Sequence, residues 1–133
     1  MDTPLEDQSL VALMPFGVAL GIELLHAEAT QVVGRMAWAA GRCTTGGVLH
    51  GGAVMALADS LGAICAFLNL PEGATTSTVE SKTNFFRPVM EGFVRATTGP
   101  LHVGRRFVTV QSDLVDDAGR LVAQTTQTQA VIT

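Results

Sequence analysis

Residues 46–67 read GGVLHGGAVMALADSLGAICAF and combine glycines, one histidine and a long apolar run. From Gly51 to about Leu70 the composition of Ala, Leu and Met favours a helix, and the run is too long and too poor in β-branched residues for a strand. Pro71 and Gly73 are expected to end this helix. Apolar residues occupy nearly every face, so the helix is predicted to be enclosed by other elements.

The sequence on both sides of this helix is mostly strand-like. Four alternating segments follow it, at residues 76–88, 92–103, 105–116 and 121–133, and the DDAGR turn with Gly119 separates the last two. Two further strands precede it, around residues 22–24 and 33–38, joined near residues 28–31. Residues 5–15 have loose helical spacing that ends at Pro15, which predicts an N-terminal helical segment over residues 1–16. We therefore expect one α+β domain over residues 1–133, with an antiparallel sheet curled around the long helix.

Composition narrows the classes of partner. The chain is 47% hydrophobic and 15% charged, so a folded core is expected, and the apolar sheet surface and edges favour a dimer. A net charge of −4 argues against a nucleic-acid partner. The two cysteines, Cys43 and Cys65, have no metal-site spacing, so no metal is expected, and Cys65 is predicted to be a buried thiol. The acidic N-terminus lacks a signal-peptide pattern and residues 53–68 are short for a membrane span, so the protein is expected to be cytoplasmic and free of membranes.

His50, Gly51 and Gly52 stand at the predicted start of the helix. The first turn of a helix has backbone N–H groups without intrahelical partners, and the helix dipole adds partial positive charge there. Two glycines let a ligand oxygen approach those groups, which suits an oxyanion that develops on a carbonyl. The alternatives are a glycine pair that only allows a tight junction and a histidine that only holds a loop.

Asp59 is the single carboxylate in the apolar run. An ionised carboxylate without a partner is costly to bury, and no Lys or Arg occurs between Gly51 and Leu70. Asp59 is therefore expected to face a wet cleft or a partner from another element or subunit, and an ion pair at an interface is the structural alternative. Nine residues of helix separate it from His50 by about 13 Å. If the two act together, a two-fold dimer would bring Asp59 of one chain to His50 of the other.

These segments resemble a known family. The stretch GGVLHGGAVMALADSLG, then TSTVESKTNFFRPV and GRRFVTVQSDLVDDAGRLVAQTTQT, is similar to the hotdog-fold acyl-CoA thioesterases of the PaaI-like (phenylacetic acid degradation) group, from roughly Gly17 to the C-terminus. The resemblance implies a long central helix wrapped by a curved antiparallel sheet. It also implies homodimers with a continuous sheet, often paired into homotetramers, and an active site at the dimer interface.

The resemblance also implies roles for individual residues. Asp59 matches the acidic nucleophile or general base, Gly51 the backbone N–H donor that polarises the thioester carbonyl, and His50 the histidine beside it. The Ser or Thr that orients the water or carboxylate falls at Thr78, or at Ser77 when counted forward from Asp59. The remaining substrate-binding candidates are Gly52, Thr44, Ser60, Asn84, Arg87, Arg105 and Arg106.

The roles of the three arginines and of Thr44 have alternatives. An arginine cluster suits the phosphates of coenzyme A, although these arginines equally suit solvated strand positions. Many relatives have Asn or Gln six residues before the histidine, where this chain has Thr44, which reaches less far and puts the efficiency of the reaction in doubt.

The sequence thus predicts hydrolysis of an acyl-CoA thioester without a metal or redox cofactor, coenzyme A being part of the substrate. Two alternatives use the same scaffold. One is a hydratase or dehydratase for acyl thioesters, whose motif typically has a proline-containing context that is absent here. The other is a non-catalytic acyl-CoA-binding module, which Thr44 favours. The acyl group is left open.

Overall fold

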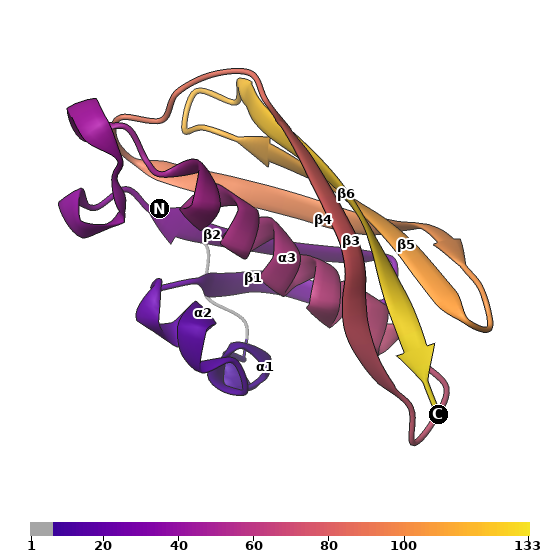
Figure 1. Cartoon of the computed structure of the whole chain (residues 1–133). Helices are drawn as coiled ribbons and strands as arrows, with labels where there is room; N and C mark the ends of the chain where they lie inside the picture. Colours follow the sequence, from indigo (N-terminus) through magenta and orange to yellow (C-terminus); the bar gives the residue numbers. More distant parts are fainter. Residues whose placement is uncertain (1–6) are drawn as a thin grey trace.

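The long helix α3 (Gly51–Leu68) lies across one face of a six-stranded antiparallel sheet (Figure 1). The computed structural model describes residues 7–133. The helix ends at Leu68, two residues before the predicted end, because the Asn69 side-chain amide donates to the Cys65 carbonyl (2.8 Å) and to the Ala29 carbonyl (2.8 Å). The long helix predicted from the apolar run is confirmed.

All the predicted strands are present. They are β1 (Glu23–Glu28), β2 (Gln31–Ala37), β3 (Thr75–Phe85), β4 (Phe93–Val103), β5 (Phe107–Val115) and β6 (Leu121–Ile132), and their order in the sheet is β1-β2-β4-β5-β6-β3. Gly119 has the left-handed backbone (φ 79°) that the predicted turn between β5 and β6 requires. The order leaves β1 and β3 as the two edge strands, and β3 lies beside α3 in Figure 1.

The core lies between the sheet and one side of α3. Leu57, Leu61 and Cys65 are fully buried, which confirms the buried thiol predicted at Cys65, and burial raises the pKa of this thiol to about 11. The prediction that α3 is enclosed on most sides is wrong for the single chain, since Gly52, Asp59 and Phe67 are exposed on the side away from the core. By length and composition α3 would also pass for a membrane span, but half of it is buried against the sheet.

The N-terminal segment differs from its prediction. It forms two short helices, α1 (Ser9–Ala12) and α2 (Pro15–Ala19), where one helix ending at Pro15 was expected. Pro15 begins the second helix because its fixed φ and missing N–H suit the first turn. The first six residues of the predicted segment lie outside the described residues.

Gly34 on β2 tests how tightly the helix packs on the sheet. A Cβ at this position would lie 2.9 Å from Leu61 Cδ2 and 3.1 Å from the Glu23 carbonyl oxygen. Gly34→Ala is therefore expected to lower the free energy of unfolding by about 1–3 kcal/mol through overpacking, measured by urea denaturation at fixed protein concentration. Gly41→Ala is the control, because nothing lies within 4 Å of its Cβ. Equal stability of the two variants would contradict tight packing at Gly34.

Candidate active site

The loop that leads into α3 is held by contacts with three parts of the fold. The Leu49 N–H donates to the Val89 carbonyl (2.8 Å), and the His50 N–H donates to the Arg42 carbonyl (2.9 Å). Trp38 Nε1 donates to the Gly47 carbonyl (2.9 Å). The start of α3 is therefore fixed relative to the end of β2 and to the β3–β4 connection.

His50, Gly51 and Gly52 each have a distinct place at this helix start. His50 Nδ1 accepts the Gly52 N–H (2.8 Å), so the ring carries its Nε2 as the outward donor. A Cβ on Gly52 would lie 2.9 Å from His50 Nδ1, so any side chain there would displace the ring. Among residues 7–133 the Gly51 N–H has no hydrogen-bond acceptor. The helix start thus presents the Gly51 N–H and His50 Nε2 as donors for an incoming oxygen.

Asp59 is exposed on α3, and one of its two carboxylate oxygens is occupied. Oδ1 accepts the Thr78 hydroxyl (2.9 Å) from β3 and the Gln127 amide Nε2 (3.0 Å) from β6. Within the described part of the chain, no hydrogen bond reaches Oδ2. The carboxylate is therefore fixed in orientation while its second oxygen faces solvent.

Thr78 and Ser77 lie on opposite faces of β3, just before a β-bulge. The pairing of β3 with β6 shifts by one residue between Thr78 and Glu80, so two β3 residues occupy the place of one. Thr78 lies on the side of α3 and bonds Asp59, whereas Ser77 is exposed and alternates to the other face. Of these two candidates, only Thr78 therefore contacts the Asp59 carboxylate.

One chain does not bring its two halves of the predicted site together. Gly51 and Asp59 are eight residues apart on the same regular helix, which corresponds to about 12 Å along its axis. The donors at the helix start and the free Asp59 oxygen therefore lie at different positions on the surface of a single chain and cannot contact the same substrate atom.

A cavity of about 360 Å³ lies beside the helix start. Its walls are mainly apolar and include Val54, Phe85 and Phe86, with Gly51 and Thr44 at its edge. A Cβ on Gly51 would lie 3.2 Å from the Phe85 ring, so the missing side chain keeps this approach open. The Thr44 hydroxyl has no hydrogen-bond partner among residues 7–133, and its N–H donates to the Val48 carbonyl (2.8 Å). Thr44 therefore lies near the helix start, where the sequence predicted a polar side chain.

The other predicted contact residues lie outside this cluster. The Ser60 hydroxyl donates to the Ala56 carbonyl of its own helix (2.7 Å). Asn84 is exposed and pairs in the sheet with Gln124, on the face opposite α3.

The three arginines do not form one cluster within the chain. The Arg87 N–H donates to the Val122 carbonyl (3.2 Å) at one end of β6, and the Arg106 carbonyl accepts from Val131 (2.8 Å) at the other. Nine residues of strand correspond to about 30 Å. Arg105, next to Arg106 in the β4–β5 connection, shares its end of the sheet. The prediction of a single arginine cluster is therefore wrong for one copy of the chain.

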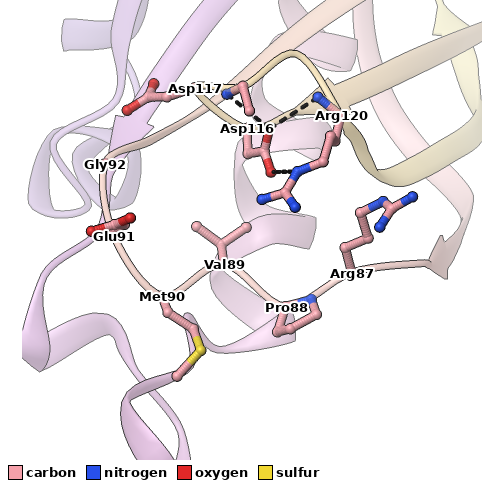
Figure 2. Close-up of a pocket in the computed structure, with 10 residues that line it drawn as sticks. Arg87, Pro88, Val89, Met90, Glu91, Gly92, Asp116, Asp117 and Arg120 are labelled. Atoms are coloured by element: carbon pink, nitrogen blue, oxygen red, sulfur yellow. Dashed lines mark hydrogen bonds and ion pairs between the residues drawn. The ribbon is translucent and has the colours of Figure 1, made fainter.

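A larger hollow of about 730 Å³ lies between the β3–β4 and β5–β6 connections (Figure 2). Arg120 Nε donates to Asp116 Oδ2 (2.9 Å), and the Arg120 backbone N–H donates to Asp116 Oδ1 (2.9 Å). That backbone N–H is the main reason why the pKa of Asp116 lies below its usual range. These contacts close the β5–β6 turn, so Asp116 and Arg120 are engaged in local structure. The hollow shares Arg87, Pro88 and Val89 with the smaller cavity.

Two residues that the sequence did not single out belong to the Asp59 cluster. Gln127 and Gln129 on β6 are buried, and Gln129 Nε2 donates to Thr78 Oγ1 (2.7 Å). The available signal was the alternation of β6, which places both amides on the face that meets α3. Among residues 7–133, no three His, Cys, Asp or Glu side chains come together as metal ligands.

Comparison with known proteins identifies the family. Residues 46–123 match the model of the thioesterase superfamily. The chain is 35% identical over 86 residues to 1,4-dihydroxy-2-naphthoyl-CoA hydrolase of Escherichia coli. This match covers 65% of this chain and 63% of the relative. The matched segments span between 54% and 63% of the lengths of the curated relatives.

Solved structures share the whole fold. A thioesterase from Haemophilus influenzae superposes with a TM-score of 0.90 at 28% identity, over 100% of this chain and 93% of that one. A mutant of the phenylacetic acid degradation protein PaaI from Thermus thermophilus superposes with a TM-score of 0.80 at 31% identity, over 87% and 97% of the two chains. The family model covers more than half of the sequence, and the architecture agrees with it. The chain therefore belongs to the thioesterase superfamily and has the hotdog fold.

Proposed function

We propose that this protein hydrolyses an acyl-CoA thioester to a free acid and coenzyme A. The observation that carries the proposal is the pairing of an unoccupied Gly51 N–H at a helix start with an Asp59 carboxylate that is fixed through one oxygen only. The thioester carbonyl oxygen would accept the Gly51 N–H, with His50 Nε2 as a second donor. The partial positive charge of the helix start stabilises the negative charge that this oxygen gains in the transition state.

Asp59 supplies the opposing group. Its free Oδ2 either takes a proton from a water that attacks the carbonyl carbon, or attacks that carbon itself before water releases the acid. In both routes the carbon–sulfur bond breaks and the coenzyme A thiolate leaves and is protonated. Thr78 holds Oδ1 and so keeps Oδ2 directed at the substrate.

The complete site would be shared by two copies of the chain. Apart from the terminal residues Gly51 and Leu68, the exposed and half-buried residues of α3 form one stripe beside the exposed edge strand β3: Gly52, Met55, Ala56, Asp59, Ser60, Ala63 and Phe67. A two-fold axis near Met55 would bring Asp59 of one copy to the level of Gly51 in the other. Pairing of the two β3 edges would join the two sheets and cover their unpaired backbone groups.

The same two-fold arrangement would bring together arginines of two copies that could bind the phosphates of coenzyme A. Antiparallel pairing of two β3 strands places the Arg87 end of one copy beside the Arg106 end of the other, because these residues lie at opposite ends of the sheet. Arg87 with Arg105 and Arg106 of a second copy would then offer guanidinium groups to the phosphates. The apolar cavity beside Gly51, lined by Phe85 and Phe86, is the proposed start of the acyl site.

Release of free thiol from a panel of acyl-CoA esters tests the proposal. The panel spans short, medium, long-chain and aromatic acyl groups, and at least one class is expected to give turnover that saturates with substrate. Hydration of an enoyl-CoA without free thiol would favour the hydratase alternative. Tight binding of acyl-CoA with no thiol release across the panel would favour the binding module, and either result would overturn hydrolysis.

A further inference from the structure

The buried amides behind Asp59 form a chain of directed hydrogen bonds. Gln129 Nε2 donates to Thr78 Oγ1 (2.7 Å), and Thr78 Oγ1 stands 2.9 Å from Asp59 Oδ1. Because the Thr78 oxygen accepts from Gln129 and a carboxylate oxygen has no proton to give, the Thr78 hydroxyl must donate to Asp59. The Thr76 hydroxyl has two acceptors in reach, Gln129 Oε1 (3.2 Å) and the Ala130 carbonyl (2.9 Å), and it donates its single proton to one of them at a time. The two bonds from Gln129 through Thr78 to Asp59 have a fixed direction.

Gln127 reaches the same carboxylate oxygen by a second route. Its Nε2 donates to Asp59 Oδ1 (3.0 Å), while its Oε1 is buried and has no hydrogen-bond partner among residues 7–133. The amide lies against Gly62 of α3, where a Cβ would collide with it. An unsatisfied buried carbonyl is destabilising, and an apolar side chain of similar size would pack in this space without it. A glutamine at this position is therefore explained better by the hydrogen bond from its Nε2 to Asp59 than by packing in the core.

We propose that Gln127 and Gln129 are positioning residues that hold Oδ1 of Asp59, one directly and one through Thr78, and so select Oδ2 as the reacting oxygen. The inference rests on the proposed thioester hydrolysis. Neither glutamine reaches the substrate, since both are buried with 1% and 0% exposure. Without them the carboxylate would rotate about its own bond and would exchange Oδ1 and Oδ2 between the solvent and the strand.

Gln127→Leu tests the direct contact. It is expected to lower kcat about tenfold or more, because a loosely held group spends less time in the reactive geometry, and to leave KM within about threefold. Its melting temperature is expected to stay the same or rise, since the unpaired buried carbonyl is removed. A purely structural glutamine would instead lower kcat and melting temperature together.

The matched control is Gln124→Leu on the same strand. Gln124 faces the other side of the sheet, where its Nε2 donates to Asp113 (2.8 Å), so its loss is expected to leave kcat unchanged. Gln129→Leu is expected to lower kcat in the native chain but to add no further loss in a Thr78→Val chain, because it acts through Thr78. An additive loss in that double variant, or a Gln127→Leu chain with native kcat, would overturn the inference.

The outcomes also separate this inference from the proposed function. A native chain that releases thiol, together with an inactive Asp59→Asn chain and a fully active Gln127→Leu chain, would remove the positioning role and leave hydrolysis in place. A native chain that releases no thiol from any acyl-CoA ester would remove both.

Discussion

Replacing Asp59 with asparagine is expected to lower kcat for thioester hydrolysis by about 10³-fold. Asparagine has the shape of aspartate, and its oxygen can still accept from Thr78 and Gln127, so the geometry of the cluster is retained. What is lost is the negative charge that lets Oδ2 accept a proton or attack a carbon. KM for acyl-CoA and the far-ultraviolet circular dichroism spectrum are therefore expected to stay close to those of the native chain, measured beside the thiol-release rate.

Asp113→Asn is the matched control for this loss. It makes the same chemical change at an exposed carboxylate on β5, which accepts a hydrogen bond from Gln124 on the side of the sheet away from α3. Its turnover is expected to remain within about twofold of the native rate, the size of a neutral surface change. Native turnover in the Asp59→Asn chain would show that the carboxylate is not the reacting group.

Local patterns were sufficient to predict the elements of the fold. The helix from Gly51 and the strands around it follow from apolar periodicity and from turn residues such as Gly119, which act over a few residues. Two errors came from information that the local pattern does not contain. An apolar helix face has the same sequence pattern whether the sheet of its own chain covers it or leaves it exposed, as at Phe67. Pro15 ends one helix and begins another with equal ease.

The candidate site was predictable only in part. His50, Gly51 and Asp59 stand out because a glycine pair and a lone carboxylate are conspicuous in an apolar helix. Gln127 is not conspicuous, since amides are common in strands and the alternation of β6 does not itself show which of its two faces meets α3. The bulge beside Thr78 is likewise invisible without the pairing of β3 with β6. Residues whose role depends on how strands pair and pack in three dimensions therefore cannot be identified from sequence spacing alone.

Gly51→Pro is expected to lower kcat by about 10²–10³-fold, the loss typical of removing one oxyanion donor. Proline removes the backbone N–H of the first residue of α3, which has no acceptor within residues 7–133, and adds the atoms of its ring. The preceding His50 already has the extended backbone (φ −60°, ψ 132°) that a residue before proline adopts, so the helix start is expected to be preserved. The thiol-release rate measures the effect, with circular dichroism as the check on folding.

Gly51→Ala separates the lost donor from the added atoms. Alanine places the same Cβ 3.2 Å from the Phe85 ring but keeps the N–H, so its kcat is expected to exceed that of Gly51→Pro by at least about tenfold. If the two variants lose the same activity, crowding against Phe85 is the cause and the Gly51 N–H is not the donor.

The same proline variant, mixed with Asp59→Asn, tests whether two chains share one site. Each variant is nearly inactive alone, but a mixed dimer would join the intact Gly51 of one chain to the intact Asp59 of the other at one of its two sites. With equal amounts refolded together, half of the dimers are mixed, so recovery of about a quarter of the native rate per chain is expected. A site contained in one chain would give no recovery, because every chain in the mixture has one lesion. Since about 12 Å of helix separates Gly51 from Asp59 within a chain, recovery is the result that the geometry of α3 requires if both residues act on one thioester.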